Sequence, residues 1–308
     1  GVTMKFDFVE VLARARQITW RSKNLWLAGI VMSLVSLLLA PISLALNPAF
    51  SSFTHLSEVN RQLPLIMRAN VSVILLTILA IPLFVIGTSI PSLGTFQLEQ
   101  GSERVNFGRL LRGVLPYFWR ILGIVLLVWV GMFLAMLILI AGVILLSFLT
   151  LGIGLLCAFP LFILLILGAI LGYALMEQGV SAVLVDHLGV SSALQRAWEL
   201  VKKNLGAMTL MSLINYLVAI VLVMIISIPM MISMSGFIPN PGPEPDVQSL
   251  ERLSRNMILW MLAFLPFYAV LQGVLLTLIQ SVWTLTYLRL TRSTTPSQPL
   301  PGTVEARS

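Results

Sequence analysis

Residues 121–176 read ILGIVLLVWVGMFLAMLILIAGVILLSFLTLGIGLLCAFPLFILLILGAILGYALM, and no charged side chain occurs between Arg120 and Glu177. A helix of about 20 apolar residues crosses the hydrocarbon of a bilayer. The 56 residues of this interval are therefore long enough for two crossings. Thr150 and Gly152 interrupt the run near its middle and predict a tight turn there. The stretch thus predicts two transmembrane helices joined as a hairpin.

Four more apolar runs of similar length bring the number of predicted spans to six. The six spans are Leu25–Leu46, Val71–Ile90, Ile121–Leu149, Leu151–Met176, Ala207–Met234 and Met257–Leu288. Only 10% of the 308 residues are charged, whereas soluble domains average about 25%. We therefore predict an all-α polytopic membrane protein, with residues 1–292 as a single transmembrane domain. The proline-rich residues 293–308 are predicted to be a disordered cytoplasmic tail.

The basic residues predict how these spans are oriented. The N-terminus, residues 91–120, residues 177–206 and residues 289–308 after the last span together hold 15 of the 19 Lys and Arg residues. Cytoplasmic segments of membrane proteins carry such an excess. Both termini are therefore predicted to be cytoplasmic, in the plasma (inner) membrane. Because the net charge of +7 lies beside hydrophobic spans, it indicates anionic lipid headgroups as partners and argues against nucleic acid.

Three of the cytoplasmic segments repeat one pattern of apolar residues. Starting from Phe8, from Phe107 and from Val190, apolar residues fall at offsets 0, 3, 4 and 7, which places them on one face of a helix. A basic residue follows thirteen positions after each start, and an apolar run comes next; these residues are Arg21, Arg120 and Lys203. Each segment is therefore predicted to be an amphipathic helix at the membrane interface.

These segments divide the domain into three predicted repeat units, about 6–90, 105–176 and 189–290. Each unit consists of an interfacial helix followed by a helical hairpin. The helix starts carry capping signals, which are Asp7 with Glu10, Asn106, and a capping box of Ser192 with Gln195. The candidate contacts to lipid headgroups are the basic residues of the interfacial helices and of the joints that follow them: Arg14, Arg16, Arg21, Arg120 and Lys203.

Three stretches resemble a family of bacterial membrane proteins. They are FVEVLARARQITWRSKNLWLAGI starting at Phe8, DHLGVSSALQRAWELVKKNLG (Asp186–Gly206) and TYLRL (Thr286–Leu290). They are similar to six-helix proteins of unknown function that are related to the membrane domain of glycerophosphoryl diester phosphodiesterase. In the enzymes that carry this domain, a separate soluble barrel with His, Glu and Asp around a divalent metal performs the chemistry. No matching motif occurs here, so the resemblance implies a membrane module without esterase activity.

The sequence offers no catalytic constellation. Its two histidines, His55 and His187, lack the three or four converging ligands that a metal site needs, and both are interpreted as solvated loop residues. Glu177 is interpreted as an ordinary residue at the cytoplasmic edge of the fourth span, in contact with water. The chain is therefore predicted not to be an enzyme and to bind no metal or cofactor.

Polar side chains within the spans leave two functions open. Asn215, Gln272 and Gln280 carry amides that form hydrogen bonds between helices or line a polar path. Because no acid lies in the middle of a predicted span, an ion-coupled pump is disfavoured. The favoured function is a non-enzymatic scaffold or accessory subunit that packs with lipids or other membrane-protein subunits. The alternative is a carrier or lipid-handling protein, with a cavity between the hairpins lined by these three residues.

Overall fold

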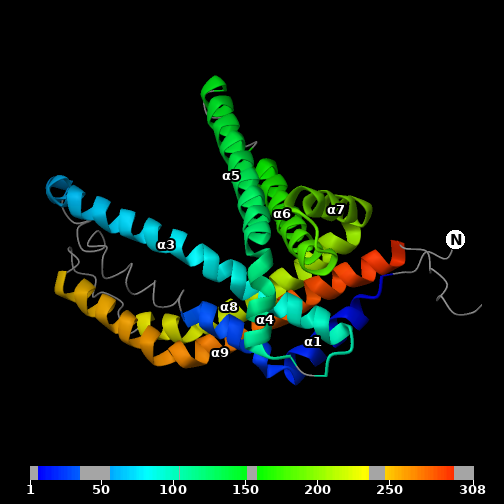
Figure 1. The fold of residues 1–308 in the computed structure, drawn as a ribbon. Helices are drawn as coiled ribbons and strands as arrows, with labels where there is room; N and C mark the ends of the chain where they lie inside the picture. The colour runs from blue at the N-terminus through cyan, green and yellow to red at the C-terminus, as the bar shows by residue number, and fades with distance from the viewer. Residues whose placement is uncertain (1–5, 35–55, 104, 151–157, 236–246, 295–308) are drawn as a thin grey trace, which may run out of the picture.

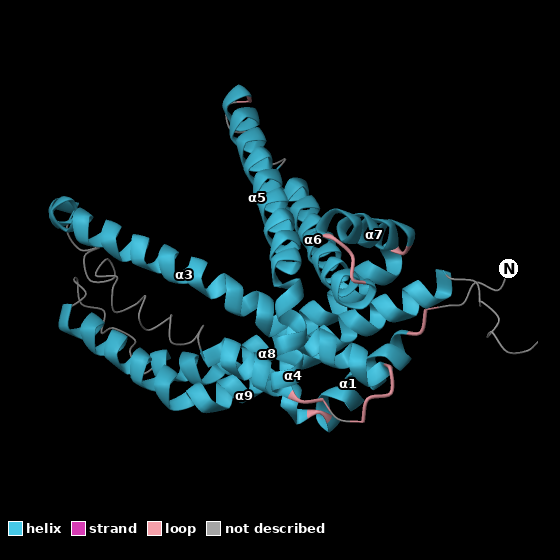
Figure 2. Cartoon of the chain, viewed as in Figure 1, coloured by secondary structure: helices cyan, strands magenta, loops and turns pink. Residues whose placement is uncertain are grey.

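All regular secondary structure that the structure describes is helical (Figure 1 and Figure 2). The structure is a computed structural model and describes residues 6–34, 56–103, 105–150, 158–235 and 247–294. The helices in these ranges are α1 (Phe8–Arg21), η1 (Lys23–Leu25), α3 (Leu56–Glu99), α4 (Phe107–Val114), η3 (Leu115–Tyr117), α5 (Phe118–Leu149), α6 (Ala158–Asp186), α7 (Val190–Lys203), α8 (Leu205–Ser235) and α9 (Val247–Thr294). Residues 26–34 are also helical.

The short helices α1, α4 and α7 begin at the residues where the three apolar patterns begin. The Asp7 carboxylate accepts hydrogen bonds from the backbone amides of Val9 and Glu10, and so caps α1. The Asn106 side chain caps α4 in the same way, by accepting from the amide of Gly108. The capping box predicted for α7 is wrong, because Gly189 is the N-cap and Ser192 lies inside the helix.

A break in the helix separates each short helix from the long helix after it. Ser22 and η1 follow α1, and a 3-10 turn that contains Pro116 follows α4. Asn204 ends α7, and the chain then turns by 98° into α8. Because proline lacks an amide hydrogen and fixes its backbone, Pro116 favours a break of this kind.

Four described helices are long and apolar enough to cross a membrane, or up to five if the bent pair α7–α8 counts as one span. Most of the predicted first span, from residue 35 to residue 46, lies outside the described residues. The proline- and glycine-rich composition of residues 236–256 predicts an irregular loop, but this prediction is wrong for residues 247–256, which form the start of α9. The helix also includes residues 293 and 294 of the predicted tail, while residues 295–308 lie outside the described part.

The buried core lies at one end of the molecule, which we call the base. There α1, α4 and α7 pack around one end of the long helices (Figure 1). The buried parts of the long helices are residues 85–95 of α3, 121–128 of α5, 174–184 of α6, 208–215 of α8 and 269–290 of α9.

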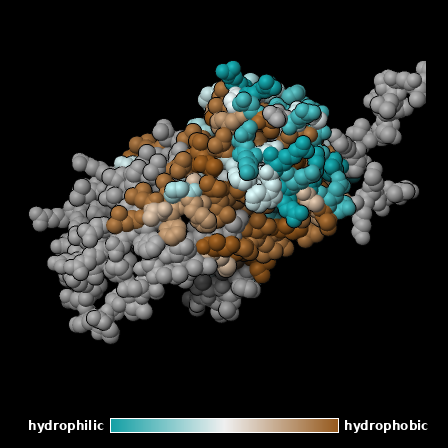
Figure 3. Space-filling model, turned by 90° about the horizontal axis from the view of Figure 1, so that it is seen from below, coloured by the Kyte–Doolittle hydropathy of each residue, from teal (hydrophilic) through white to brown (hydrophobic). Residues whose placement is uncertain are grey.

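Beyond the base, the long helices separate. Figure 1 shows α5 and α6 running together in one direction while α3, α8 and α9 run in another. We call residues 129–149 of α5 and 160–170 of α6 the outer arm; none of them is buried, and large side chains such as Phe148 are exposed. Hydrophilic residues gather at one end of the face in Figure 3, and hydrophobic residues cover most of the rest of its coloured part. Among the residues whose burial the structure describes, the long helices are therefore buried mainly near their polar end.

Candidate functional site: a polar cluster inside the base

A buried carboxyl group connects three long helices. The Gln280 Nε2 of α9 donates a hydrogen bond to Glu177 Oε1 of α6, at 3.1 Å. The Ser92 hydroxyl of α3 donates to Gln280 Oε1, at 2.9 Å. All three side chains are buried, and Glu177 is 4% exposed. Among the described residues, no ion pair joins Glu177 to a basic side chain. Its hydrogen-bond partners are therefore neutral groups, the amide of Gln280 and the hydroxyl of Tyr173.

Two more polar contacts lie within one helical turn of these three hydrogen-bonded residues. The hydroxyls of Thr95 and Ser281 are 2.8 Å apart and link α3 to α9. Gln178 donates to the backbone carbonyl of Trp283, at 3.5 Å, which links α6 to α9. All of these side chains are buried. Glu177, Gln280 and their neighbours therefore form one cluster, which we call the polar cluster.

The polar cluster lies well inside the helices. Gln280 is nine residues from Arg289 on α9, and Glu177 is nine residues from the end of α6 at Asp186. At 1.5 Å per residue, each lies about 13 Å from the charged end of its helix. The interpretation of Glu177 as a water-exposed boundary residue is therefore wrong. The first charge after an apolar run predicts the end of a span, but α6 continues beyond Glu177 to Asp186, and the Glu177 carboxyl group is buried against α3 and α9.

The three amides singled out in the sequence have different environments. Gln280 is in the polar cluster. Asn215 is 5% exposed, and its Nδ2 has no hydrogen-bond partner among the described residues. Gln272 is only partly buried. The structure therefore does not bring the three side chains together in one recorded network.

Several buried polar atoms near the cluster also lack a partner within the described part of the chain. They are Gln178 Oε1, Trp283 Nε1, Thr284 Oγ1 and Ser212 Oγ. A buried polar group without a hydrogen bond costs about 1–3 kcal/mol of stability. These atoms lie on α6, α8 and α9, so each of these helices presents unused hydrogen-bonding capacity inside the base.

A second group of charged residues lies near the C-terminal ends of α3 and α9. Glu99 accepts from Arg14 Nε at 2.7 Å and lies 3.6 Å from Arg289 Nη2. Arg289 also pairs with Glu10, at 2.8 Å. The Glu99 side chain is only 8% exposed. This network ties α1 to α3 and α9, so Arg14 holds helices together in addition to its predicted contact with lipid.

The other residues predicted to contact lipid headgroups are all exposed, but one of them also has a hydrogen bond within the protein. Arg16, Arg21 and Lys203 are exposed. Arg120 is exposed as well, but it donates to the backbone oxygen of His187, at 3.0 Å. The His187 ring stacks on Tyr117, with 5.3 Å between ring centroids, so this histidine packs at the joint between α6 and α7.

Polar residues of the cluster follow a helical spacing that is visible in the sequence. On α3, Thr88, Ser92 and Thr95 fall at offsets 0, 4 and 7. On α9, Gln280, Ser281 and Thr284 fall at offsets 0, 1 and 4. Residues at these offsets share one helix face. A polar stripe within an apolar span predicts a face that packs against other polar groups, and this signal could have identified the cluster.

No protein-family model matches this chain, and neither a curated protein nor a solved structure matches it. The resemblance to the membrane domain of glycerophosphoryl diester phosphodiesterase therefore stays a prediction. No functional residue is transferred from a relative, and the case for function depends on the geometry of this chain alone.

Proposed function

We propose that the protein is a non-enzymatic scaffold or accessory subunit of a bacterial inner membrane, related to the six-helix proteins named above. In this proposal six helices cross the bilayer as three hairpins, and both termini are cytoplasmic. The helices α1, α4 and α7 lie at the level of the cytoplasmic headgroups. The outer arm packs against other membrane components.

The observation that carries this proposal is the exposed apolar surface of the outer arm. Phe148 is 81% exposed and Ile138 is 73% exposed, and the outer arm carries no charged residue. Water excludes such a surface, so lipid or a partner protein covers it. The ordered base at the opposite end gives the arm a fixed support.

Exposed tryptophans support the placement of the short helices. Trp20 of α1, Trp119 at the start of α5 and Trp198 of α7 are 59%, 76% and 56% exposed. Indole rings concentrate at the headgroup level of membranes, where one part of the ring is apolar and the N–H finds a partner. Arg16, Lys203 and these rings together provide both interactions that an interfacial helix uses.

Site-specific photocrosslinking tests the scaffold proposal. A photoreactive amino acid replaces Ile138 or Phe148 of the outer arm in native membranes, and Ile124 of the base serves as the matched control because it is fully buried. The proposal predicts discrete protein adducts from the two arm positions and none from position 124. If both arm positions capture only lipid, the scaffold function is wrong.

The polar cluster supports a second candidate function, a carrier. A buried acid inside a membrane bundle is a feature of ion and substrate pathways. Glu177 has this environment, and the unpaired atoms of Gln178 and Asn215 offer further contacts for a polar ligand. Because Glu177 is buried between helices, the lack of an acid in the middle of a predicted span no longer argues against an ion-coupled carrier.

The accessibility of position 92 to water distinguishes the carrier from the scaffold. Cys157 is the only cysteine, so Ser92→Cys in a Cys157→Ser background gives one reactive thiol. A carrier has a water-filled path to the polar cluster, and a small water-soluble thiol reagent then labels position 92. A scaffold with a dry base predicts no labelling at position 92, while a cysteine at the exposed position Arg16 reacts in both cases.

A further inference from the structure

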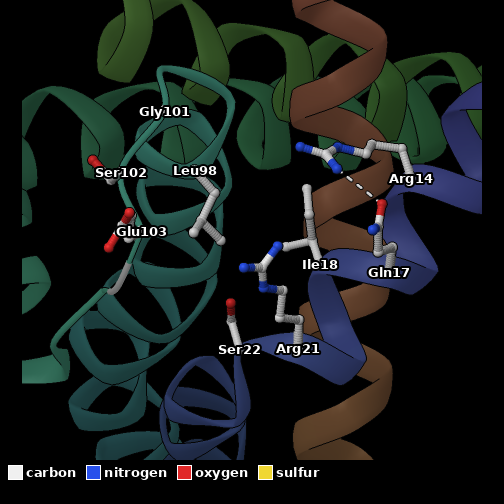
Figure 4. A pocket seen from close by; sticks show the side chains of 9 residues that line it. All are labelled: Arg14, Gln17, Ile18, Arg21, Ser22, Leu98, Gly101, Ser102 and Glu103. Carbon is white, nitrogen blue, oxygen red and sulfur yellow. Dashed lines mark hydrogen bonds between the residues drawn. The ribbon is translucent and has the colours of Figure 1, made fainter.

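A pocket lies at the cytoplasmic end of the base, between α1 and the turn that follows α3 (Figure 4). Its volume is about 200 Å³, and α1 and the turn after α3 each contribute polar side chains to its walls. Ile18 and Leu98 add apolar surface, so the pocket combines a charged rim with an oily part. One of its walls belongs to α1, the helix that the proposed function places at the headgroup level.

The turn that forms one wall has a fixed geometry. Gly101 has a φ of +96°, and its amide donates to the carbonyl of Leu98, while the amide of Ser102 donates to the carbonyl of Gln97. These two bonds around a left-handed glycine are the Schellman motif that ends many helices. The motif holds Ser102 and Glu103 in place opposite α1.

Two opposite charges line this pocket without pairing with each other. Arg14 is already paired with Glu99 and with the amide of Gln17. Within the described ranges, Arg21 and Glu103 have no ion pair. Figure 4 shows them on facing walls, Arg21 from α1 and Glu103 from the turn. The pocket therefore offers one cation and one anion, held apart, with a net charge near zero.

We infer that this pocket binds the phosphoethanolamine headgroup of a membrane phospholipid. The phosphate contacts the Arg21 guanidinium and the Ser22 hydroxyl, because guanidinium groups match phosphate oxygens in geometry and charge. The primary ammonium contacts the Glu103 carboxylate and the Ser102 hydroxyl. The inference rests on the proposed placement of α1 at the headgroup level.

The chemistry of the lining favours this headgroup over the other common ones. An anionic headgroup such as phosphoglycerol has no cation to meet Glu103, and the carboxylate repels its phosphate. A choline headgroup has no N–H to donate, and proteins usually bind it with aromatic rings. No aromatic side chain lines this pocket. Ethanolamine has three N–H donors, and the carboxylate and hydroxyl oxygens accept them.

Lipid retention in native mass spectrometry tests the inference. The full-length protein is reconstituted in nanodiscs of equal parts phosphatidylethanolamine, phosphatidylcholine and phosphatidylglycerol, then released into mild detergent. Wild type should retain phosphatidylethanolamine in preference to the other two lipids. Glu103→Gln and Arg21→Gln should each lower that preference about threefold, the loss expected for one partly exposed ion pair. Glu199→Gln, which changes an exposed carboxylate of α7 outside the pocket, should leave the preference unchanged.

Three outcomes overturn the inference. The first is equal retention of all three lipids by wild type, and the second is an unchanged preference in Glu103→Gln. The third is a preference for phosphatidylglycerol that Arg21→Gln removes, because this marks a plain anion site. A separate experiment adds soluble glycerophosphoethanolamine to the protein in detergent. If this compound binds as tightly as the lipid, the pocket is a site for a soluble phosphodiester and not for a membrane lipid.

A depth measurement separates this inference from the proposed function. A fluorophore on Trp20→Cys, in the Cys157→Ser background, is exposed to lipids that carry a quencher in the headgroup. Quenching without selectivity for phosphatidylethanolamine overturns the headgroup inference alone. If the fluorophore is not quenched, α1 does not lie at the headgroups. This result contradicts the proposed function, and the headgroup inference, which depends on it, fails with it.

Discussion

The base and the outer arm show how differently two parts of one apolar chain pack. In the base, Trp283 and Tyr287 are fully buried and the polar side chains of the cluster connect α3, α6 and α9. In the outer arm, no residue is buried, although its side chains are more apolar. Lipid is as apolar as leucine, so hydrophobicity alone gives membrane helices no reason to associate. Closely packed small residues and polar contacts hold the base together, whereas nothing lies within 4 Å of a Cβ added at Gly131, Gly142 or Gly168 of the arm.

The closest approach of two helices in the base gives the largest expected effect. A Cβ on Gly273 of α9 would lie 2.7 Å from the carbonyl oxygen of Trp26, so the two backbones leave no room for a side chain. Gly273→Val should destabilise the protein by about 3 kcal/mol, because backbone atoms cannot move aside as a side chain can. Thermal unfolding of the purified protein in one detergent measures this.

Gly131→Val in the outer arm is the matched control for that substitution. Nothing lies within 4 Å of a Cβ added at Gly131, so the unfolding temperature should stay close to that of wild type. Equal effects of the two substitutions would show that the base is not packed more tightly than the arm.

Removing the central amide of the polar cluster should give the next largest effect. Gln280→Leu removes one hydrogen-bond partner from the Glu177 carboxyl and one from the Ser92 hydroxyl, which should cost about 1–3 kcal/mol. Gln272→Leu, at a partly buried position of the same helix, should have little effect in the same unfolding assay. If Gln280→Leu is neutral or stabilising, the cluster does not hold α3, α6 and α9 together.

A smaller effect is expected from the charged network at the end of α3. Glu99→Gln keeps the shape of the side chain but removes its attraction to Arg14 and Arg289, and should cost about 1 kcal/mol. The difference from wild type should shrink as salt is added, because salt screens partly exposed pairs. Glu199→Gln, at an exposed position of α7, is the control. A loss that is independent of salt would mean that packing and not charge is responsible.

The smallest effect is expected for the surface of the outer arm. Phe148→Ala removes a large side chain that is 81% exposed, so unfolding in detergent should change by no more than about 0.5 kcal/mol. The same truncation at fully buried Ile124 should cost about 2–5 kcal/mol. A large loss for Phe148→Ala in detergent would show that the arm has an internal packing partner.

The helical class, the apolar spans and the starts of α1, α4 and α7 could be predicted from the sequence. Offsets of 0, 3, 4 and 7 define one helix face whatever the fold, so Phe8, Phe107 and Val190 carry a local signal. The environment of Glu177 could not be predicted in the same way, because it depends on Ser92 and Gln280, far away in the chain. A charge beside an apolar run looks the same at a membrane edge and inside a bundle.

Helix ends show the same difference: features made by neighbouring residues could be predicted, and features made by distant residues could not. Asp7 and Asn106 cap their helices as the sequence predicts, because a cap is made by residues next to it. The start of α9 at Val247 could not be predicted, because the prolines before it predict a loop that continues to residue 256. The pocket beside Arg21 needed the structure, since the facing Glu103 comes from a distant segment of the chain.

The central claim, that the three short helices share one side of a membrane that the long helices cross, is tested most directly by labelling single cysteines from each side. In a Cys157→Ser background, cysteines replace Arg16 of α1, Glu199 of α7, Arg112 of α4 and Thr150 at the far end of α5. An impermeant maleimide should label positions 16, 112 and 199 only from the cytoplasmic side, and position 150 only from the opposite side. Labelling of positions 16 and 150 from the same side, or of the three short helices from different sides, would contradict the account.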